Sequence, residues 1–241
     1  MKLIKFLIVF GIAYGIGYYV YHYKKGIIMR QLKQGTIIIL NGPSAAGKTT
    51  LQKELQKTMN ELYLTVGVDG FFDAVLPHDF PDGQSYVGGE FVRGVATTVD
   101  SEGHSIITLN IGKAGRRVVT GMHHAFAAYA AAGNNLVIDY ILYERDWLSE
   151  LVQALKDYKV YFVGVTIPLE VLEERERARG TSPVGHARSH YATVHAHGIY
   201  DLQVDTSKMS AQEAAKVIKQ FVMNNPQPQA FRKLFDKIDN N

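Results

Sequence analysis

Between Gly35 and residue 223, short runs of consecutive apolar residues alternate with longer segments in which apolar residues recur at helical spacing. A continuous β-branched run such as Thr36-Ile-Ile-Ile-Leu40 is typical of a strand that is buried on both faces of a parallel sheet. Strands that alternate with helices predict an α/β fold, with a parallel five-stranded sheet and helices on both of its faces. The predicted strands are 36–40, 62–68, 136–139, 160–167 and 201–204, and the predicted helices are 48–60, 114–132, 146–158, 169–178 and 210–223.

Two segments interrupt this alternation. Residues 77–113 are rich in Gly, Pro and Asp and contain a predicted hairpin, in which 95–99 pairs with 105–110. An insertion of this length in an α/β core usually forms a lid or a substrate-binding segment. The second segment, residues 175–199, is rich in arginine and histidine.

The N-terminal segment differs from the rest of the chain. Residues 6–21 form an uncharged apolar run with lysines on both sides, and a bilayer span needs about 20 residues. We interpret this run as an apolar helix that attaches the chain to a membrane; a cleaved signal peptide and a translation start at Met29 remain alternatives. The basic residues after the run favour a cytoplasmic position for the main domain, so the expected location is the inner membrane or the cytoplasm. These basic residues are Lys24, Lys25, Arg30 and Lys33.

Composition and charge exclude several kinds of site and one kind of partner. The 241 residues include no cysteine, which excludes disulfides, zinc–thiolate sites and cysteine nucleophiles. The formal charge of +3 comes from residues 1–30, which hold five basic residues and no acidic residue. The remainder holds 21 basic and 23 acidic residues, so we expect no nucleic-acid partner. We predict three parts, an apolar segment at 1–29, a main domain at 30–223 and a C-terminal tail at 224–241 that ends in a short helix.

The segment between the first predicted strand and the first predicted helix fits the pattern G-x-x-x-x-G-K-[ST] at every fixed position. Glycines let the backbone turn tightly and direct consecutive N–H groups at phosphate oxygens. Lys48 is expected to reach the β- and γ-phosphates, and the Thr49 hydroxyl to bind Mg²⁺. This pattern predicts the P-loop NTPase fold with a site for ATP and Mg²⁺. The predicted nucleotide-binding residues are Gly42, Pro43, Ser44, Ala45, Ala46, Gly47, Lys48, Thr49 and Thr50.

Two aspartates follow predicted strands. Asp139 ends the run that begins at Leu136, and we expect it to hold Mg²⁺ directly or through water. Asp69 lies at the carboxyl end of the strand predicted at 62–68, and that edge of an open α/β sheet faces the ligand crevice. A carboxylate at this place can accept the proton of an attacking hydroxyl group. An ordinary turn residue at a strand end is the alternative for both aspartates.

Six motifs follow one another over about residues 35–222, namely Asn41–Thr49, Gly67–Asp69, Leu136–Asp139, Val163–Val165, Arg175-x-x-x-Arg179-Gly180 and Tyr200–Thr206. The phosphate-binding segment is common to many families, whereas its combination with the Gly-Val-Asp and Tyr-Asp-x-x-Val-Asp-Thr motifs is more specific. The six motifs come in the same order as in chloramphenicol phosphotransferases. The chain therefore resembles the chloramphenicol phosphotransferase-like family of P-loop kinases.

This resemblance implies a kinase that transfers the γ-phosphate of ATP to a hydroxyl group of a small, chloramphenicol-like acceptor, with Asp69 as the general base. The segment 77–113 departs most from the family pattern and is the segment that we expect to shape the acceptor pocket. A kinase of nucleotide sugars of the zeta-toxin type therefore remains an alternative. A membrane-tethered nucleotide-binding module without kinase activity is the alternative from another class.

Two arginines complete the predicted catalytic group with Lys48 and Asp69. Arg175 and Arg179 are four residues apart and share a helix face. The resemblance favours a lid on which both arginines close over the γ-phosphate. Pairing with neighbouring glutamates on a solvated helix face is the alternative, and we favour it for Arg177.

The remaining histidines and aromatic residues give weaker signals. The four histidines of the second segment match no familiar zinc spacing, so we interpret them as lid or surface residues. Phe71, Phe72 and Phe91 are expected either to line an apolar acceptor pocket or to pack in the core. Arg116 and Arg117 are interpreted as surface residues. The four histidines are His186, His190, His195 and His197.

Overall fold

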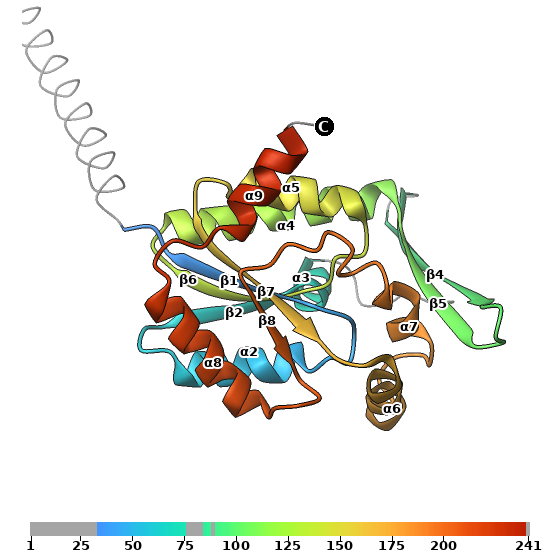
Figure 1. Cartoon of the computed structure of the whole chain (residues 1–241). Helices are drawn as coiled ribbons and strands as arrows, with labels where there is room; N and C mark the ends of the chain where they lie inside the picture. The colour runs from blue at the N-terminus through green and yellow to red at the C-terminus, as the bar shows by residue number, and fades with distance from the viewer. Residues whose placement is uncertain (1–32, 76–83, 88–89, 240–241) are drawn as a thin grey trace, which may run out of the picture.

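The computed structural model describes residues 33–75, 84–87 and 90–239, and Figure 1 shows their arrangement. The apolar helix and membrane attachment that we predicted within residues 1–29 lie outside the described residues. Within the described ranges, no helix combines the length and the apolar character that a membrane crossing requires.

A parallel sheet of five strands forms the centre of the described structure, in the order β2-β6-β1-β7-β8. This sheet confirms the predicted α/β fold, and each strand end differs from its predicted position by one residue at most. The strands are β1 (Thr36–Asn41), β2 (Tyr63–Gly67), β6 (Asn135–Tyr140), β7 (Lys159–Thr166) and β8 (Leu202–Asp205).

The central strand β1 is buried on both faces, as its β-branched sequence predicts. Ile37 and Ile39 belong to one hydrophobic cluster, which the helices α4, α5 and α9 cover. Ile38 and Leu40 point to the opposite cluster, under α2 and α8 (Figure 1). The two layers of helices therefore hold β1 and the loop after it between them. The helices are α2 (Lys48–Thr58), α4 (Lys113–Ala131), α5 (Arg145–Leu155), α8 (Ala211–Asn224) and α9 (Ala230–Asp239).

The start of α8 shows how a local signal defines a helix end. The Ser210 side chain accepts the backbone N–H of Glu213 at 3.3 Å, and the Glu213 carboxylate accepts the backbone N–H of Ser210 at 2.8 Å. These reciprocal bonds form a capping box, which satisfies two backbone donors that the helix itself leaves without partners.

A second, antiparallel sheet has the order β3-β4-β5. Its hairpin confirms the predicted pairing of 95–99 with 105–110, because Val99 pairs with Ser105 and Val95 with Leu109. Figure 1 shows the hairpin beside the short helix α7, near α6. The Ile107 N–H donates to the Gly185 carbonyl at 3.1 Å, which ties the hairpin to the start of α7. These elements are β3 (Gln84–Val87), β4 (Glu90–Val99), β5 (Ser105–Ile111), α6 (Leu169–Arg179) and α7 (His186–Tyr191).

Three of the short elements are absent from our predictions, namely β3, α7 and the helix α3 (Val68–Val75). The helix α3 begins directly after β2, so Asp69 lies in its first turn rather than in a loop.

Candidate active site

The loop between β1 and α2 is shaped by close backbone contacts. A Cβ atom at Gly42 would lie 2.4 Å from the Val165 carbonyl oxygen of β7, so only glycine fits there. Gly47 has a φ of 87° and offers no side-chain oxygen at the N-terminus of α2. The first N–H groups of α2 therefore lack a side-chain cap at Gly47, and an anion can accept from them.

Lys48, Thr49 and Asp139 meet at this helix end. Lys48 is only 4% exposed; its Nζ donates to the Pro43 carbonyl at 2.9 Å and lies 3.5 Å from Asp139 Oδ1. The Thr49 hydroxyl donates to Asp139 Oδ2 at 2.6 Å. Strand register explains the meeting, because Asp139 on β6 pairs with Leu40 on one side and with Gly67 on the other. A hydroxyl and a carboxylate side by side are oxygen ligands of the kind that Mg²⁺ prefers.

A cavity of about 410 Å³ opens above these residues and includes most of the predicted nucleotide-binding loop. Three predicted loop residues contribute in other ways. Gly42 packs against β7, Pro43 offers its carbonyl to Lys48, and Ala46 is buried with its carbonyl accepting from Thr206 at 2.8 Å. The cavity is lined by Ser44, Ala45, Gly47, Lys48, Thr49, Thr50, Asp69, Asp139, Ile141, Arg175 and Arg179.

A second cavity, of about 590 Å³, adjoins the first and is largely apolar. Phe71, Phe126 and Ile141 contribute apolar side chains to it. Asp69 lines both cavities, as do the other four residues that the two linings share. The structure therefore places Asp69 at the junction of a smaller polar space and a larger apolar one. The other shared residues are Thr49, Asp139, Ile141 and Arg179.

The aspartates at the junction also influence Tyr143. Burial raises the pKa of Tyr143 far above its ordinary value, and the negative charges of Asp69 and Asp139 add to this rise. The Tyr143 hydroxyl therefore stays protonated and lies 3.4 Å from His186 Nε2.

The two predicted catalytic arginines lie at the first cavity but differ in their contacts. Arg175 donates to the Thr206 carbonyl at 2.8 Å and to its hydroxyl at 3.2 Å. Arg179 is exposed and lines both cavities, so its guanidinium group can approach a ligand in either one. Arg177 is exposed and lines neither cavity.

The histidines of 186–197 lie deeper than our surface interpretation implied. His190 is 3% exposed, and the other three are half-buried. His195 Nδ1 lies 2.7 Å from the Tyr200 hydroxyl, and His197 stacks on Phe162 with ring centroids 5.1 Å apart. Within the described ranges they form no group with metal-ligand spacing. They pack among aromatic rings, and His190 contacts the loop between β1 and α2 (residues 42–47, the phosphate loop). The interpretation as lid or surface residues was therefore wrong about the surface for His190.

The phenylalanines divide between the two environments that we considered. Phe71 lines the second cavity, whereas Phe72 is buried in the core with the Arg93 guanidinium 5.7 Å from its ring centre. Phe91 packs next to Gly112, where a Cβ would come within 2.5 Å of the Phe91 ring.

The surface interpretation holds for the neighbouring arginines Arg116 and Arg117. Their half-exposed side chains pair with Glu144 and Glu90.

Sequence reasoning missed three residues that support the site. His190 accepts a hydrogen bond from the phosphate loop, Thr206 holds Ala46 and Arg175, and Glu176 is a buried carboxylate between α6 and α7. Thr206 closes the Tyr-Asp-x-x-Val-Asp-Thr motif, so the resemblance carried a signal for it. Glu176 lies in a charge-rich helix in which no local pattern distinguishes it from its exposed neighbours.

Comparison with known proteins gives consistent matches. A family model described as chloramphenicol phosphotransferase-like protein matches residues 35–223. A protein of Mycobacterium tuberculosis (strain ATCC 25618 / H37Rv) with the name "Putative O-phosphotransferase Rv2636" is 28% identical over 206 residues, which cover 86% of this chain and 90% of that protein.

Solved structures also align over most of the chain. The M. tuberculosis APS kinase CysC, in complex with AMPPNP and APS, aligns with a TM-score of 0.53 and 13% identity, over 79% of this chain and 98% of that chain. A sugar kinase from Janibacter sp. HTCC2649 aligns with a TM-score of 0.54 and 16% identity, over 78% of this chain and 94% of that chain. At these identities the two structures establish a common fold.

Proposed function

Because this chain belongs to the chloramphenicol phosphotransferase-like family and is a kinase, we propose that it transfers the γ-phosphate of ATP to a hydroxyl group of a small molecule. The kinase assignment sets aside the alternative of a nucleotide-binding module without kinase activity. One observation carries the proposal: Asp69 lines both the polar cavity beside Lys48 and the apolar cavity that adjoins it.

In this proposal the polar cavity binds the triphosphate. The N–H groups at the start of α2 donate to phosphate oxygens, and Lys48 exchanges its contact with the Pro43 carbonyl for the β- and γ-phosphates. Thr49 and Asp139 are the residues that would hold Mg²⁺, and their adjacent oxygens fit that ion. When bound, Mg²⁺ supplies positive charge beside the phosphate oxygens.

Asp69 then acts on the acceptor. Its carboxylate takes the proton of the acceptor hydroxyl as that oxygen forms a bond to the γ-phosphorus, and the bond between the γ-phosphorus and the ADP oxygen breaks. The position of Asp69 at the junction supports this role, because the hydroxyl must point from the acceptor cavity towards the terminal phosphate.

The two arginines neutralise charge during the transfer. Arg179 is exposed and lines both cavities, which supports a contact with the γ-phosphoryl group as it moves from one cavity to the other. Arg175 is held by Thr206 close to Gly47, so its charge is fixed beside the phosphate loop.

The acceptor cavity favours a molecule with an apolar body. Its wall includes Phe71, Phe126 and Ile141, and Arg179 is the only basic residue among the described residues that line it. A chloramphenicol-like alcohol with an aromatic ring fits this lining, since small-molecule sites combine an apolar wall with a few polar groups.

The test is ATP consumption by the full chain with a panel of hydroxylated aromatic compounds and nucleotide sugars. Asp69→Asn is expected to lower acceptor-dependent turnover by at least about a hundredfold, because general-base catalysis contributes factors of this size. Nucleotide affinity should change little, since the loop contacts are intact. Undiminished turnover in Asp69→Asn would refute the role of Asp69.

Asp73→Asn is the matched control. Asp73 is exposed on the same helix α3 and lines neither cavity. Its turnover should equal that of the unchanged chain, so a loss in both variants would point to a general effect on α3 instead.

A further inference from the structure

The buried side chain of His190 forms a hydrogen bond with the backbone of the phosphate loop. The backbone N–H of Ser44 donates to His190 Nε2 at 3.0 Å, and both atoms are buried. Because an N–H group donates to Nε2, this nitrogen carries no proton, and the ring proton of the neutral imidazole lies on Nδ1. Nδ1 lies 3.2 Å from the Ser189 hydroxyl, which donates to the His186 carbonyl at 2.7 Å. Hydrogen bonds therefore hold the ring at both of its nitrogens.

The surroundings of His190 keep it neutral. Its ring makes edge contacts with Tyr143 and His186, each with centroids 5.0 Å apart. Burial, and then electrostatic interaction with His186 and Lys48, lower the pKa of His190 to about 3. The imidazole thus remains a hydrogen-bond acceptor for Ser44 throughout the pH range in which kinases work.

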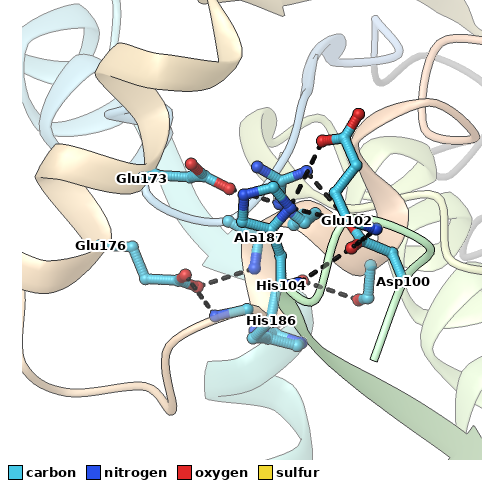
Figure 2. Close-up of polar contacts among 10 residues, drawn as sticks. Asp100, Glu102, His104, Glu173, Glu176, His186 and Ala187 are labelled. Carbon is cyan, nitrogen blue, oxygen red and sulfur yellow. Dashed lines mark hydrogen bonds and ion pairs between the residues drawn. The ribbon is translucent and has the colours of Figure 1, made fainter. Parts of the chain in front are cut away.

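The helix that carries His190 is itself anchored. At its start, the buried Glu176 carboxylate accepts the Gly185 N–H at 2.8 Å and the Ala187 N–H at 2.7 Å. Figure 2 shows Glu176 directed at Ala187, with Glu173 above it on α6 and Asp100 of the hairpin turn on the other side. Arg188 links these two sides, since its guanidinium lies 2.5 Å from Glu173 and 3.3 Å from Asp100. The helix α7 is therefore fixed to α6 and to the hairpin.

The phosphate loop has a strained point where this support acts. Ala45, the residue after Ser44, has a φ of 62°, a left-handed conformation that is unfavourable for a non-glycine residue. A loop that contains such a residue needs contacts that hold it in the binding conformation. His190 supplies one at Ser44, and Thr206 supplies another at the Ala46 carbonyl.

We propose that His190 is a positioning residue for the nucleotide: its Nε2 fixes the Ser44 peptide, so that the loop amides already have their binding conformation when the triphosphate arrives. This inference rests on the proposed nucleotide site. It extends that site to α7, so a side chain that touches no phosphate contributes to nucleotide affinity through pre-organisation.

Two variants of His190 separate this role from simple packing. In His190→Gln the side-chain oxygen is three bonds from Cβ, as Nε2 is, and can accept from Ser44. In His190→Asn the oxygen is one bond shorter and does not reach. We expect His190→Asn to weaken calorimetric binding of Mg²⁺–AMPPNP about tenfold, the effect of leaving a buried N–H without its acceptor. The KM for ATP should rise equally at nearly constant kcat, and His190→Gln should stay within about twofold of the unchanged chain.

Equal affinity in all three proteins, or an equal loss in both variants, would overturn the proposal. A measurement on the unchanged chain covers the case in which His190→Asn does not fold. The ¹⁵N chemical shifts of His190 should report a ring protonated at Nδ1 alone, and a ring protonated at Nε2 contradicts the Ser44 contact. If the unchanged chain does not bind AMPPNP, the proposed function fails and this inference with it, whatever the histidine spectrum shows.

Discussion

At the scale of single residues, buried imidazoles set a limit on the acid stability of the fold. His123 on α4 is 1% exposed, and its Nε2 lies 2.9 Å from the Tyr140 hydroxyl. Burial lowers the pKa of His123 to about 4. The Glu150 carboxylate, 3.7 Å from Nδ1, favours the charged form, but its side chain is 46% exposed and burial prevails.

This depressed pKa predicts a loss of stability in mild acid. The folded state keeps His123 neutral down to about pH 4, whereas the unfolded chain takes up its proton near pH 6.5. The contribution of neutral His123 to the free energy of unfolding is thus fully present above pH 6.5. It is lost as the pH falls towards 4, by up to about 1.4 kcal/mol per pH unit. Denaturant unfolding of His123→Gln across this range gives the change of the free energy of unfolding with pH. This change should be smaller than in the unchanged chain, because about one proton fewer is taken up on unfolding. The exposed neighbour His124 is the control, and a His124→Gln slope that falls as far would contradict the assignment.

Residue spacing predicted some of the site contacts and not others. Lys48 and Thr49 follow from a fixed local pattern, and Asp139 from its position at a strand end, and the structure brings the three together. His190 could not be predicted in this way, because its contact with Ser44 joins residues 146 positions apart. Such a contact depends on where α7 packs, which no local pattern specifies.

At the scale of elements, the length of a helix or strand determines whether the sequence pattern predicts it. The long helices and the sheet strands carry enough apolar positions for their periodicity to be recognised. The helix α7 has six residues and β3 has four, too few for a periodic signal. The helix α3 follows β2 with no intervening turn residue, so the sequence pattern assigned its first residue, Val68, to the end of the strand predicted at 62–68. These short elements are held by tertiary contacts, which explains why they lack a strong local signature.

The contact between α7 and the hairpin depends on one glycine. Gly185 has a φ of 98°, and a Cβ there would lie 2.1 Å from the Ser105 carbonyl oxygen. We expect Gly185→Ala to destabilise the chain by about 3 kcal/mol, since backbone strain adds to a clash that only a backbone shift can relieve. Thermal unfolding measures the loss. The control is Gly180→Ala, where φ is 63° but no atom lies within 4 Å; it should cost only about 1 kcal/mol. Similar losses in both variants would show that the clash does not matter.

At the scale of the whole molecule, strand order determines where ligands can bind. The carboxyl ends of β2, β6 and β1 are adjacent, so the loops after them share one edge of the sheet. Alternation of strands and helices predicted a parallel sheet, but the order β2-β6-β1-β7-β8 follows from long-range pairing that the sequence pattern does not encode. The meeting of the two cavities at Asp69 is a consequence of that order.

Nucleotide binding should stabilise the whole fold. At a Mg²⁺–ATP concentration about 100 times Kd, binding to the folded state alone adds about 2.7 kcal/mol, which corresponds to a rise in Tm of about 5–10 °C for a domain of this size. EDTA should reduce this rise, because Thr49 and Asp139 are the residues that would hold Mg²⁺ in the proposed site, and the positive charge that the ion would supply is then absent. Differential scanning fluorimetry gives both values.

Lys48→Met tests whether the rise comes from the proposed site. Methionine is of similar length and suits the buried position, so the variant should fold but show almost no rise with Mg²⁺–ATP. Lys53→Met, an exposed position on the same helix, should keep the full rise. A rise that survives in Lys48→Met would place the nucleotide elsewhere.

In the proposed site, strand β6 lies between the elements around the polar cavity and those around the apolar cavity. It pairs with β1 on one side and with β2 on the other, and Asp139 at its carboxyl end lines both cavities, as do Thr49, Asp69, Ile141 and Arg179. Other residues, such as Phe71 and Phe126, line the apolar cavity alone. Descendants of such a chain can therefore exchange one alcohol for another by altering these residues, while the phosphate donor is inherited unchanged.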